Sequence, residues 1–350
     1  MSDSSKSSIF EGAFETADQT PSIDDKRRFS GVSGFDEGVL FRLFEIEEAS
    51  CRADFTRALK LIESLIDSGS SATELAVLTY RMVIEVTLAD VEQAYRDYCR
   101  LKLLCDEGLE HATGDIPIGP YVLSALFVES IVTASLFDVP DFSGEIENFP
   151  LGMKAYFGYL LGMQTLRQGN YEEAVGIAYA YQTLVGQSMP ESRVFLHLVA
   201  AIGNLMMDNV ERAESEFDAA WSLGERYDIV TPFVVLNSFL LGFMRHHCRK
   251  RGIDESRRIS ALARTFRDGW FGLRKKCGLP SEGLELTTLQ SYVGGLAAIG
   301  WSNNRIAEWL FISENTVKHH LTSVYQKTGV SNRKELRSFF ASQYRAVKLS

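Results

Sequence analysis

The C-terminal part of the chain spaces its hydrophobic residues as a series of short amphipathic helices. A first helix is predicted over residues 288–299, with Thr287 as its N-cap and Gly300 at its end. A second short helix begins after a cap at Ser302 or Asn303. The positions in these two helices that recur at helical spacing, and should face a core, are Val293, Leu296, Ala297, Gly300, Ile306, Ala307 and Leu310.

The third helix of this series has one apolar and one polar side. It is predicted over residues 314–328, with Ser313 as N-cap and Gly329 as its stop. Its apolar stripe, which should pack on the first two helices, is Val317, Leu321 and Val324. The polar side chains rotated away from that stripe are Lys318, His319, Thr322 and Gln326. A small helical unit with an exposed polar helix face is suited to enter a DNA major groove.

A fourth helix is predicted from Asn332, which forms a capping pattern with Glu335, to about Ser342. The motifs of the whole segment run, in order, Leu286-Thr287, Gly300-x-Ser302-Asn303, Ile306-Ala307, Ile312-Ser313, Thr316-Val317-Lys318-x-His320-Leu321, Tyr325-x-Lys327, Gly329-Val330 and Arg333-x₂-Leu336. This order resembles the LuxR-type helix-turn-helix of GerE- and NarL-like transcriptional regulators. The resemblance implies a four-helix DNA-binding domain, at residues 286–345, that dimerises through its last helix and binds two promoter half-sites.

The resemblance also assigns roles to individual side chains. Lys318, His319 and Thr322 are expected to contact bases, with Lys318 reading guanine because an ammonium suits the O6 and N7 acceptors. The residues expected to contact phosphates and fix the docking register are Asn303, Thr316, Lys327 and Arg333. His320 matches the family histidine and should pack or touch the backbone. For each of these residues, the alternative is a solvated helix face.

The segment departs from the family pattern at three positions. Gln290 stands where the family usually has Glu, and Gly294 where it has a large apolar residue. Two adjacent glycines inside a helix destabilise it by roughly 0.5–1 kcal/mol each relative to alanine. Thr328 replaces a preferred Leu. We therefore expect a weak first helix, whereas the recognition helix is unaffected.

Upstream, residues 35–272 read almost entirely as helix and contain an internal repeat. Each copy of the repeat is a turn of two residues, followed by a larger residue and, three positions after that residue, by a small alanine. It occurs four times, as Ala53-Asp54-Phe55-x₂-Ala58, Ala89-Asp90-Val91-x₂-Ala94, Gly169-Asn170-Tyr171-x₂-Ala174 and Asp208-Asn209-Val210-x₂-Ala213. These helical hairpins resemble a tetratricopeptide-like solenoid with long, loose repeats. The fold class predicted is therefore all-α, with a generic helical bundle as the alternative for this region.

A solenoid would offer a concave surface for a protein, peptide or small-molecule effector. Tyrosines could line such a groove, although aromatic residues at helical spacing more often belong to a core: Tyr95, Tyr98, Tyr156, Tyr159, Tyr171, Tyr179 and Tyr181. The section from about 107 to 150 escapes the repeat. Its longest apolar window, 121–139, is interrupted by polar residues and is interpreted as a buried helix, not a membrane span.

The remaining segments are predicted to be connections. Residues 1–34 lack a hydrophobic period and read as a flexible tail. Residues 273–285 form the natural linker, because Gly and Pro are concentrated there. A basic run at its start, Arg274 to Lys276, either contacts DNA phosphates or is simply solvated.

Charge divides the chain in the same place. From residue 284 onward there are 8 Lys and Arg against 4 Asp and Glu, a net charge of +4, whereas the whole chain carries −10. Residues 1–283 therefore carry −14. A basic C-terminal unit attached to an acidic body favours DNA contact at one end only, because the DNA phosphates repel the acidic body.

Candidate chemistry is sparse. Five unpatterned cysteines and an N-terminus without an apolar signal favour a reducing cytoplasm. No Gly-x₄-Gly-Lys-Ser/Thr phosphate-binding loop occurs, so ATP-driven control has no site. No other catalytic or cofactor motif occurs either, so neither an enzyme nor a cofactor is predicted. His246-His247-Cys248 suggests a metal site, but neighbouring residues on a helix diverge by about 100°, so no metal is predicted.

These observations predict a cytoplasmic, homodimeric regulator that binds double-stranded DNA sequence-specifically. Its helical body would sense a signal or partner and control DNA binding, either by changing dimerisation or by freeing the recognition helix. The alternative is a helical-repeat scaffold or adaptor whose C-terminal unit contacts protein instead of DNA.

Overall fold

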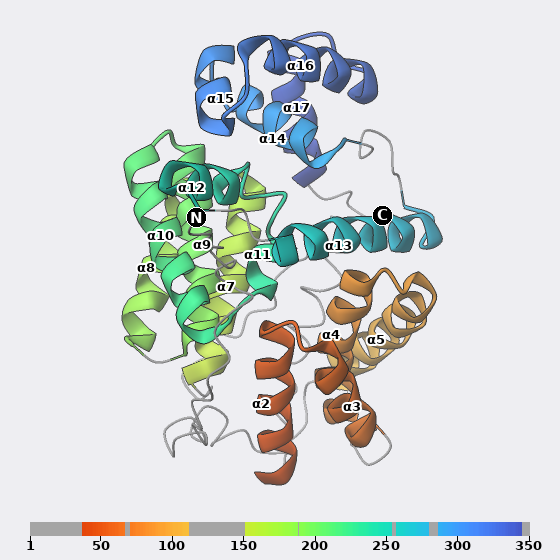
Figure 1. The fold of residues 1–350 in the computed structure, drawn as a ribbon. Coiled ribbons are helices and arrows are strands. Elements are labelled where there is room, and N and C mark those ends of the chain that lie inside the picture. The colour runs from red at the N-terminus through yellow and green to blue at the C-terminus, as the bar shows by residue number, and fades with distance from the viewer. Residues whose placement is uncertain are drawn as a thin grey trace, which may run out of the picture.

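The computed structural model describes residues 37–66, 71–111, 151–187, 189–253, 257–279 and 286–344. Within these ranges all the regular secondary structure is helical, which confirms the all-α prediction. Figure 1 shows a body made of the helices up to α13, with the last four helices seated together on one end of it. The predicted tail, the 121–139 window and residues 280–285 of the predicted linker lie outside the described residues. None of the described helices is both long and apolar enough to cross a membrane.

The body begins with two helical hairpins. The helices are α2 (Glu37–Cys51), α3 (Phe55–Ile66), α4 (Ser71–Leu88) and α5 (Val91–His111). Two further hairpins follow, formed by α7 (Leu151–Gln168), α8 (Tyr171–Val185), α9 (Pro190–Met206) and α10 (Val210–Tyr227). In the second group α9 is central, because it packs against α7, α8 and α10. Most buried apolar side chains of the first group form one cluster, whereas those of the second group belong to a larger cluster that continues into the last four helices of the chain.

The four repeated sequence turns are the four hairpin turns. The turn residues that adopt a left-handed backbone are Ala53 (φ 56°), Ala89 (φ 59°), Gly169 (φ 85°) and Asp208 (φ 66°). In every case the next residue donates its backbone N–H to the carbonyl five residues back, which closes the preceding helix. The repeat alanines, Ala58, Ala94, Ala174 and Ala213, are all 0% exposed where the helices cross. The helical hairpins are therefore real, and their tetratricopeptide identity remains a prediction.

Three helices connect the hairpins to the C-terminal unit: α11 (Thr231–Val235), α12 (Phe243–Arg251) and α13 (Arg257–Lys276). Helix α13 lies across α4, α5 and α11 and extends four residues into the predicted linker. The basic run there is held by the body, since Arg274 lies 4.9 Å from the Trp270 ring centroid and Lys276 pairs with Glu92. The last four helices are α14 (Thr288–Ala298), α15 (Asn303–Leu310), α16 (Glu314–Thr328) and α17 (Arg333–Tyr344).

The crossing of α13 over α4 depends on Gly269. A Cβ atom at this position would lie 2.1 Å from the Val86 carbonyl oxygen, which is backbone and cannot swing aside. We expect Gly269→Ala to destabilise the protein by about 1–3 kcal/mol or more, because the two helices must separate. Gly176→Ala, on α8 with nothing within 4 Å, is the matched control and should stabilise by about 0.5–1 kcal/mol. Urea denaturation measures both, and equal effects would contradict the close crossing.

Candidate DNA-binding site

Capping side chains fix where the helices of the C-terminal unit begin. Thr287 and Gln290 form a reciprocal capping box: the Gln290 N–H donates to Thr287 Oγ1 (3.3 Å) and the Thr287 N–H donates to Gln290 Oε1 (2.9 Å). Ser302, not Asn303, caps α15, and Ser313 caps α16. Gly329 ends α16 with φ 69°. The predicted start and end of α16 are thus confirmed.

The recognition helix α16 is anchored by its predicted stripe. Val317 and Val324 are 0% exposed and Leu321 is 6% exposed. These side chains pack toward α14 and α15, which α16 contacts along its inner side. Because three successive turns are buried, the opposite face of α16 is held outward in a fixed rotation.

That outward face carries the three predicted base-contacting residues. Lys318, His319 and Thr322 are all exposed. The Lys318 ammonium forms an exposed ion pair with Glu314 at 2.9 Å, one turn earlier. Exposed ion pairs of this kind contribute little, so an acceptor on a base can replace it. The Thr322 hydroxyl donates to the Lys318 carbonyl at 3.0 Å. In Figure 1, α16 lies on the side of the C-terminal unit that faces away from the body.

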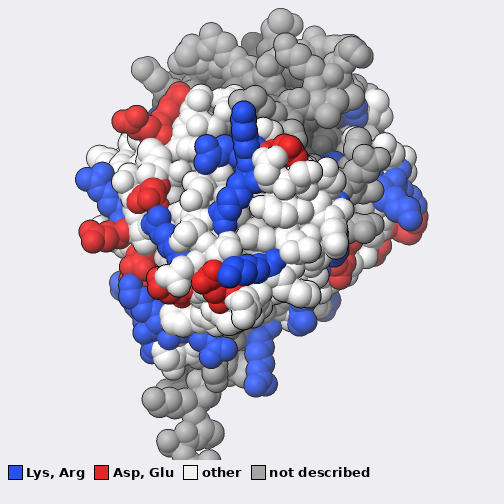
Figure 2. Space-filling view, turned by 90° about the horizontal axis from the view of Figure 1, so that it is seen from above, with Lys and Arg blue, Asp and Glu red and all other residues white. Residues whose placement is uncertain are grey.

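Figure 2 views the molecule from this end. Lys and Arg side chains stand out on a largely uncharged surface, and Asp or Glu side chains lie beside several of them. The surface is therefore mixed in charge, with neutral area between the charged groups. Such a face can approach a groove floor without the strong repulsion that an acidic surface would cause.

The four predicted phosphate contacts have different local partners. The Lys327 ammonium donates to Gln290 Oε1 at 3.0 Å, and the hydroxyls of Thr316 and Ser313 are 2.8 Å apart. Arg333 is bound inside the domain, because its guanidinium donates to Asn303 Oδ1 at 2.6 Å and also to the Trp301 carbonyl. Arg333 thus ties α17 to the start of α15, and in doing so positions Asn303.

The unusual Gly294 has a packing reason. A Cβ atom there would lie 2.9 Å from the Phe340 ring of α17 and 3.3 Å from Val324. The missing side chain makes room for Phe340, so tertiary packing offsets the low helix propensity. Gln290 likewise replaces the family glutamate without loss of the cap, and its amide nitrogen donates to Ser323 at 2.9 Å.

Comparison with known proteins identifies this unit. Residues 285–340 match the family described as bacterial regulatory proteins, luxR family. These residues form a LuxR-family domain.

Relatives match over the same part of the chain. The CsgBAC operon transcriptional regulatory protein of Escherichia coli and the probable csgAB operon transcriptional regulatory protein of Salmonella typhimurium are each 44% identical over 59 residues. The probable transcriptional regulatory protein SgaR of Hyphomicrobium methylovorum is 48% identical over 48 residues. These matches cover 14–17% of this chain and 23–27% of the relatives. The chain thus spans about a quarter of their length. No solved structure matches the chain.

The LuxR-family domain is docked on the body through polar contacts at its second helix. The Arg305 guanidinium pairs with Asp208 at 2.6 Å, and the Trp301 indole N–H donates to the same carboxylate at 3.0 Å. The hydrogen bond from Arg305 holds the pKa of Asp208 below its usual value. Asp208 is also a hairpin turn residue, so the repeat itself presents the acceptor.

A second docking contact surrounds Trp309, which is 4% exposed. Its indole N–H donates to the Leu241 carbonyl at 3.1 Å, and its ring stacks on His246 with centroids 3.8 Å apart. His246 also bridges the Trp309 carbonyl and the Glu214 carboxylate. Gly242, with φ 87°, lets the chain pass directly under Leu310, because a Cβ there would lie 2.5 Å from that side chain.

Two further hydrogen bonds join the first helix of the LuxR-family domain to the body. The Tyr292 hydroxyl and the Asn237 carboxamide oxygen are 2.5 Å apart, and Arg267 of α13 donates to Thr288 Oγ1 at 2.9 Å. Sequence reasoning missed these docking residues. The one available signal was the surplus of large aromatic residues on the domain, Tyr292, Trp301 and Trp309, outside the predicted core stripe. A small domain that stood alone would expose them.

Helix α17 has two different faces. On one face, Arg337 and Phe340 line a cavity of about 310 Å³ with Leu166 and Tyr171 of the body. On the other, Lys334, Glu335, Ser338 and Phe339 line a shallow surface groove with Val330 and Asn332. The docked body therefore covers one side of α17 and leaves the other side open.

The His246-His247-Cys248 run is used for packing. The described residues contain no group of three or more His, Cys, Asp or Glu able to hold a metal ion. His247 is 4% exposed, and its Nδ1 lies 2.7 Å from an Asp218 oxygen. Cys248 is buried beside it. These residues fasten α12 to α10.

Burial makes His247 sensitive to acid. Burial lowers the pKa of His247 below its ordinary value of 6.5, against the opposing effect of Asp218. The folded state thus binds its proton less readily than the unfolded state does, so this contribution to stability falls as pH drops below 6.5. We expect His247→Asn to lose less unfolding free energy than the wild type between about pH 7 and pH 5. The exposed His319→Asn serves as control; identical pH profiles for wild type and His247→Asn would contradict the prediction.

Proposed function

We propose that the chain is a sequence-specific transcription regulator that binds double-stranded DNA through its LuxR-family domain. The observation that carries this proposal is the outward face of α16, where Lys318, His319 and Thr322 are exposed while the body is docked. An α-helix with a polar exposed face fits the width of the major groove. The relatives named as transcriptional regulators support the same role for this domain.

Within the groove, we assign base contacts to Lys318, His319 and Thr322. Asn303, Thr316 and Lys327 lie at helix starts and at the end of α16, where phosphates would pass. Arg333 also belongs to the predicted phosphate-contacting residues, but its guanidinium is already bound inside the domain. Its main contribution is therefore to hold Asn303 in place. An arginine so engaged adds charge near a phosphate without having to reach it.

The regulator would bind DNA as a homodimer. The open face of α17 remains available for a second copy while the body is docked, so dimerisation does not require the domain to separate from the body. Two-fold symmetry would place two recognition helices one helical turn apart on the duplex. The recognition helix is already exposed while the domain is docked, so it does not have to be released from the body. The helical body would therefore control DNA binding by changing the position of the docked domain.

Removal of the Lys318 side chain tests the base-reading role. We expect Lys318→Ala to weaken binding to duplexes selected by the wild-type chain by about 1–3 kcal/mol and to relax the preference at one base pair. Random-duplex selection followed by fluorescence anisotropy measures both quantities.

Lys60→Ala is the matched control, because Lys60 is an exposed lysine on α3 in the body. It makes the same change in charge and should leave affinity and preference unaltered. If both variants bind alike, Lys318 does not read DNA. If no duplex is selected at all, the scaffold or adaptor function takes precedence.

A further inference from the structure

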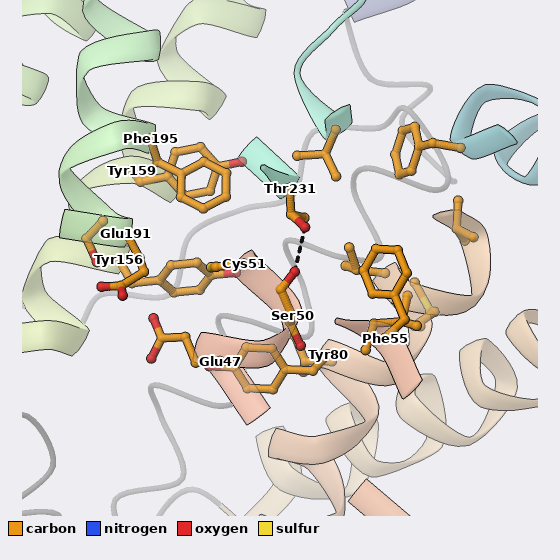
Figure 3. Close-up of a pocket in the computed structure, with 18 of the residues that line it drawn as sticks. Glu47, Ser50, Cys51, Phe55, Tyr80, Tyr156, Tyr159, Glu191, Phe195 and Thr231 are labelled. Carbon is orange, nitrogen blue, oxygen red and sulfur yellow. Dashed lines mark hydrogen bonds between the residues drawn. The ribbon is translucent and has the colours of Figure 1, made fainter. Parts of the chain in front are cut away.

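Cavity size separates two possible ligand sites. The pocket in Figure 3, where the Thr231 hydroxyl donates to the Ser50 carbonyl at 2.5 Å, has a volume of about 90 Å³. At about 30 Å³ per water molecule, it has room for about three waters and is too small for most organic ligands. The cavity between the body and α17 has a volume of about 310 Å³, which is room for about ten non-hydrogen atoms. Small-molecule sites typically begin at about 300 Å³, so the second cavity is large enough.

This larger cavity, called the interface cavity below, lies between the body and the LuxR-family domain. The body contributes the end of α7, the start of α8 and the end of α9. The domain contributes the end of α14 and the inner face of α17. Most of the lining side chains are apolar: Leu166, Ile202, Met206, Phe239, Leu241, Ala298, Ile299 and Phe340. An apolar group bound here would therefore leave water on two sides, which favours its binding.

The polar side chains of the interface cavity are basic or neutral. The described residues that line it include Arg167, Arg337 and Tyr171 and no Asp or Glu. Arg167 already interacts within the protein, so the selectivity argued below does not depend on it. Burial raises the pKa of Tyr171 above its ordinary value, against the opposing charge of Arg337, so the phenol stays protonated and can donate a hydrogen bond. An anionic group is thus favoured here over a cationic one.

Arg337 is the side chain that can bind an anion directly. It lines the cavity from α17 and is exposed, so it lies where the cavity opens to solvent. Its Nε donates to the Ala298 carbonyl at 2.8 Å, which fixes the guanidinium in place, and it forms no ion pair with a described carboxylate. A guanidinium has five N–H donors, so the remaining ones can hold a carboxylate through two parallel hydrogen bonds.

We propose that the interface cavity binds a small amphiphilic monocarboxylate, a molecule with one carboxylate and an apolar chain or ring of about eight carbon atoms. The apolar part lies between the end of α9 and the end of α14. The carboxylate accepts hydrogen bonds from the Arg337 guanidinium and the Tyr171 hydroxyl.

A ligand at this place contacts the body and the domain at once. Leu166 and Tyr171 belong to the body, whereas Arg337 and Phe340 belong to α17. The opposite face of α17 carries the open groove assigned above to a second copy of the chain. Occupancy therefore changes the placement of α17 and, through the dimer, the affinity for DNA. This second part rests on the proposed function, whereas ligand binding itself does not.

Isothermal titration calorimetry on the full chain, with octanoate as the probe, tests the site. Octanamide and octylammonium carry chains of the same length and differ from octanoate in charge. We expect octanoate to bind at least about fivefold more tightly than octanamide, and octylammonium to bind more weakly than both. The factor is moderate because Arg337 is exposed, and water weakens ion pairs at exposed positions.

Two variants locate the binding. Arg337→Gln removes the charge and should bind octanoate no more tightly than octanamide; Arg249→Gln, an exposed arginine of α12 outside the cavity, is its control and should bind like the wild type. Met206→Trp fills the cavity with a larger side chain and should weaken octanoate and octanamide alike by about tenfold or more. Leu184→Trp, at a position that is 49% exposed on α8, is the matching control.

Circular dichroism confirms that each variant is folded, and the three probes on the wild type decide the charge preference even where a variant is not. Absence of saturable octanoate binding overturns the proposal, and so does equal binding of octanoate and octanamide by the wild type. Unchanged octanoate affinity in either Arg337→Gln or Met206→Trp overturns the assignment to this cavity.

The effector role is measured separately, by fluorescence anisotropy on selected duplexes with and without saturating octanoate. A change in DNA affinity of at least about threefold, absent in Met206→Trp, supports this role. Octanoate binding without any change in DNA affinity overturns the effector role and leaves the site standing. If the chain binds no duplex, the proposed function fails while calorimetry still decides the cavity.

Discussion

Duplex binding by the full chain is expected to fall by roughly 10³–10⁵ in affinity between 50 and 200 mM salt. The reason is the release of counterions from DNA when lysine and arginine side chains neutralise phosphates. On α16 and α17 of each protomer, four described cationic side chains do not line the contact with the body: Lys318, Lys327, Arg333 and Lys334. A dimer brings eight such charges close to the duplex. Lys318 and Arg333 contribute by their charge near the phosphates and not by direct phosphate contacts, and the total is comparable with the about 6–10 neutralised phosphates to which that loss applies.

Anisotropy at a series of salt concentrations gives the slope of log affinity against log salt. Lys327→Ala should reduce this slope by about one for each bound protomer, whereas Lys60→Ala, on the body, should leave it unchanged. A slope near zero would show that the LuxR-family domain does not meet the phosphate backbone. The adaptor function would then be the better account, because an adaptor requires no duplex binding.

Trp309→Ala is expected to reduce the free energy of unfolding by about 3–5 kcal/mol. The side chain is 4% exposed, stacks on His246 and donates to the Leu241 carbonyl, so its removal leaves a cavity between domain and body. It also leaves that carbonyl without its indole donor. Urea denaturation followed by circular dichroism measures the change.

Two variants separate docking from a general loss of aromatic surface. Phe41→Ala removes a ring that is 42% exposed on α2 and should change stability by no more than about 0.5 kcal/mol. Trp309→Phe keeps a ring and loses only the N–H, so its effect should lie between the other two. A loss below about 1 kcal/mol for Trp309→Ala would mean that the domain is not held by this contact.

The body and the domain differ in how their charges are used at the interface. Asp208 of the body pairs with Arg305 of the domain, and Glu214 contacts His246, the body residue whose ring stacks on Trp309 of the domain. One acidic group of the body thus helps to hold the domain, while the net negative charge of the body is expected to repel DNA elsewhere on the surface. This arrangement keeps a single DNA-facing end while the two parts stay together.

Local chemistry explains why so much of the C-terminal unit could be predicted. A cap needs only a side chain and an N–H three residues on, so Ser313 and Thr287 mark helix starts unaided. Gly329 marks the end of α16 because it adopts a left-handed backbone without strain. The hairpin turns at Ala53 and Asp208 repeat for the same reason, as their closing hydrogen bonds lie within a few residues.

Prediction failed or stopped where contacts join distant parts of the chain. Helix α13 continues past the predicted linker start because Leu273 is buried in the body. The adjacent glycines predicted to weaken α14 are packing positions: Gly294 admits Phe340, and Gly295 admits Leu241. Nothing near either glycine in sequence indicates these partners.

By itself, the sequence determined the helical hairpins, the boundaries of the LuxR-family helices and the outward face with Lys318, because these follow from side-chain periodicity and bonds between near neighbours. Only the tertiary structure decided that Trp309 and Arg305 hold the domain on the body and that Arg333 binds inside the domain. Those features depend on contacts between segments that lie many tens of residues apart in the sequence. Burial of apolar surface stabilises these contacts, and no local sequence pattern indicates which segments will meet.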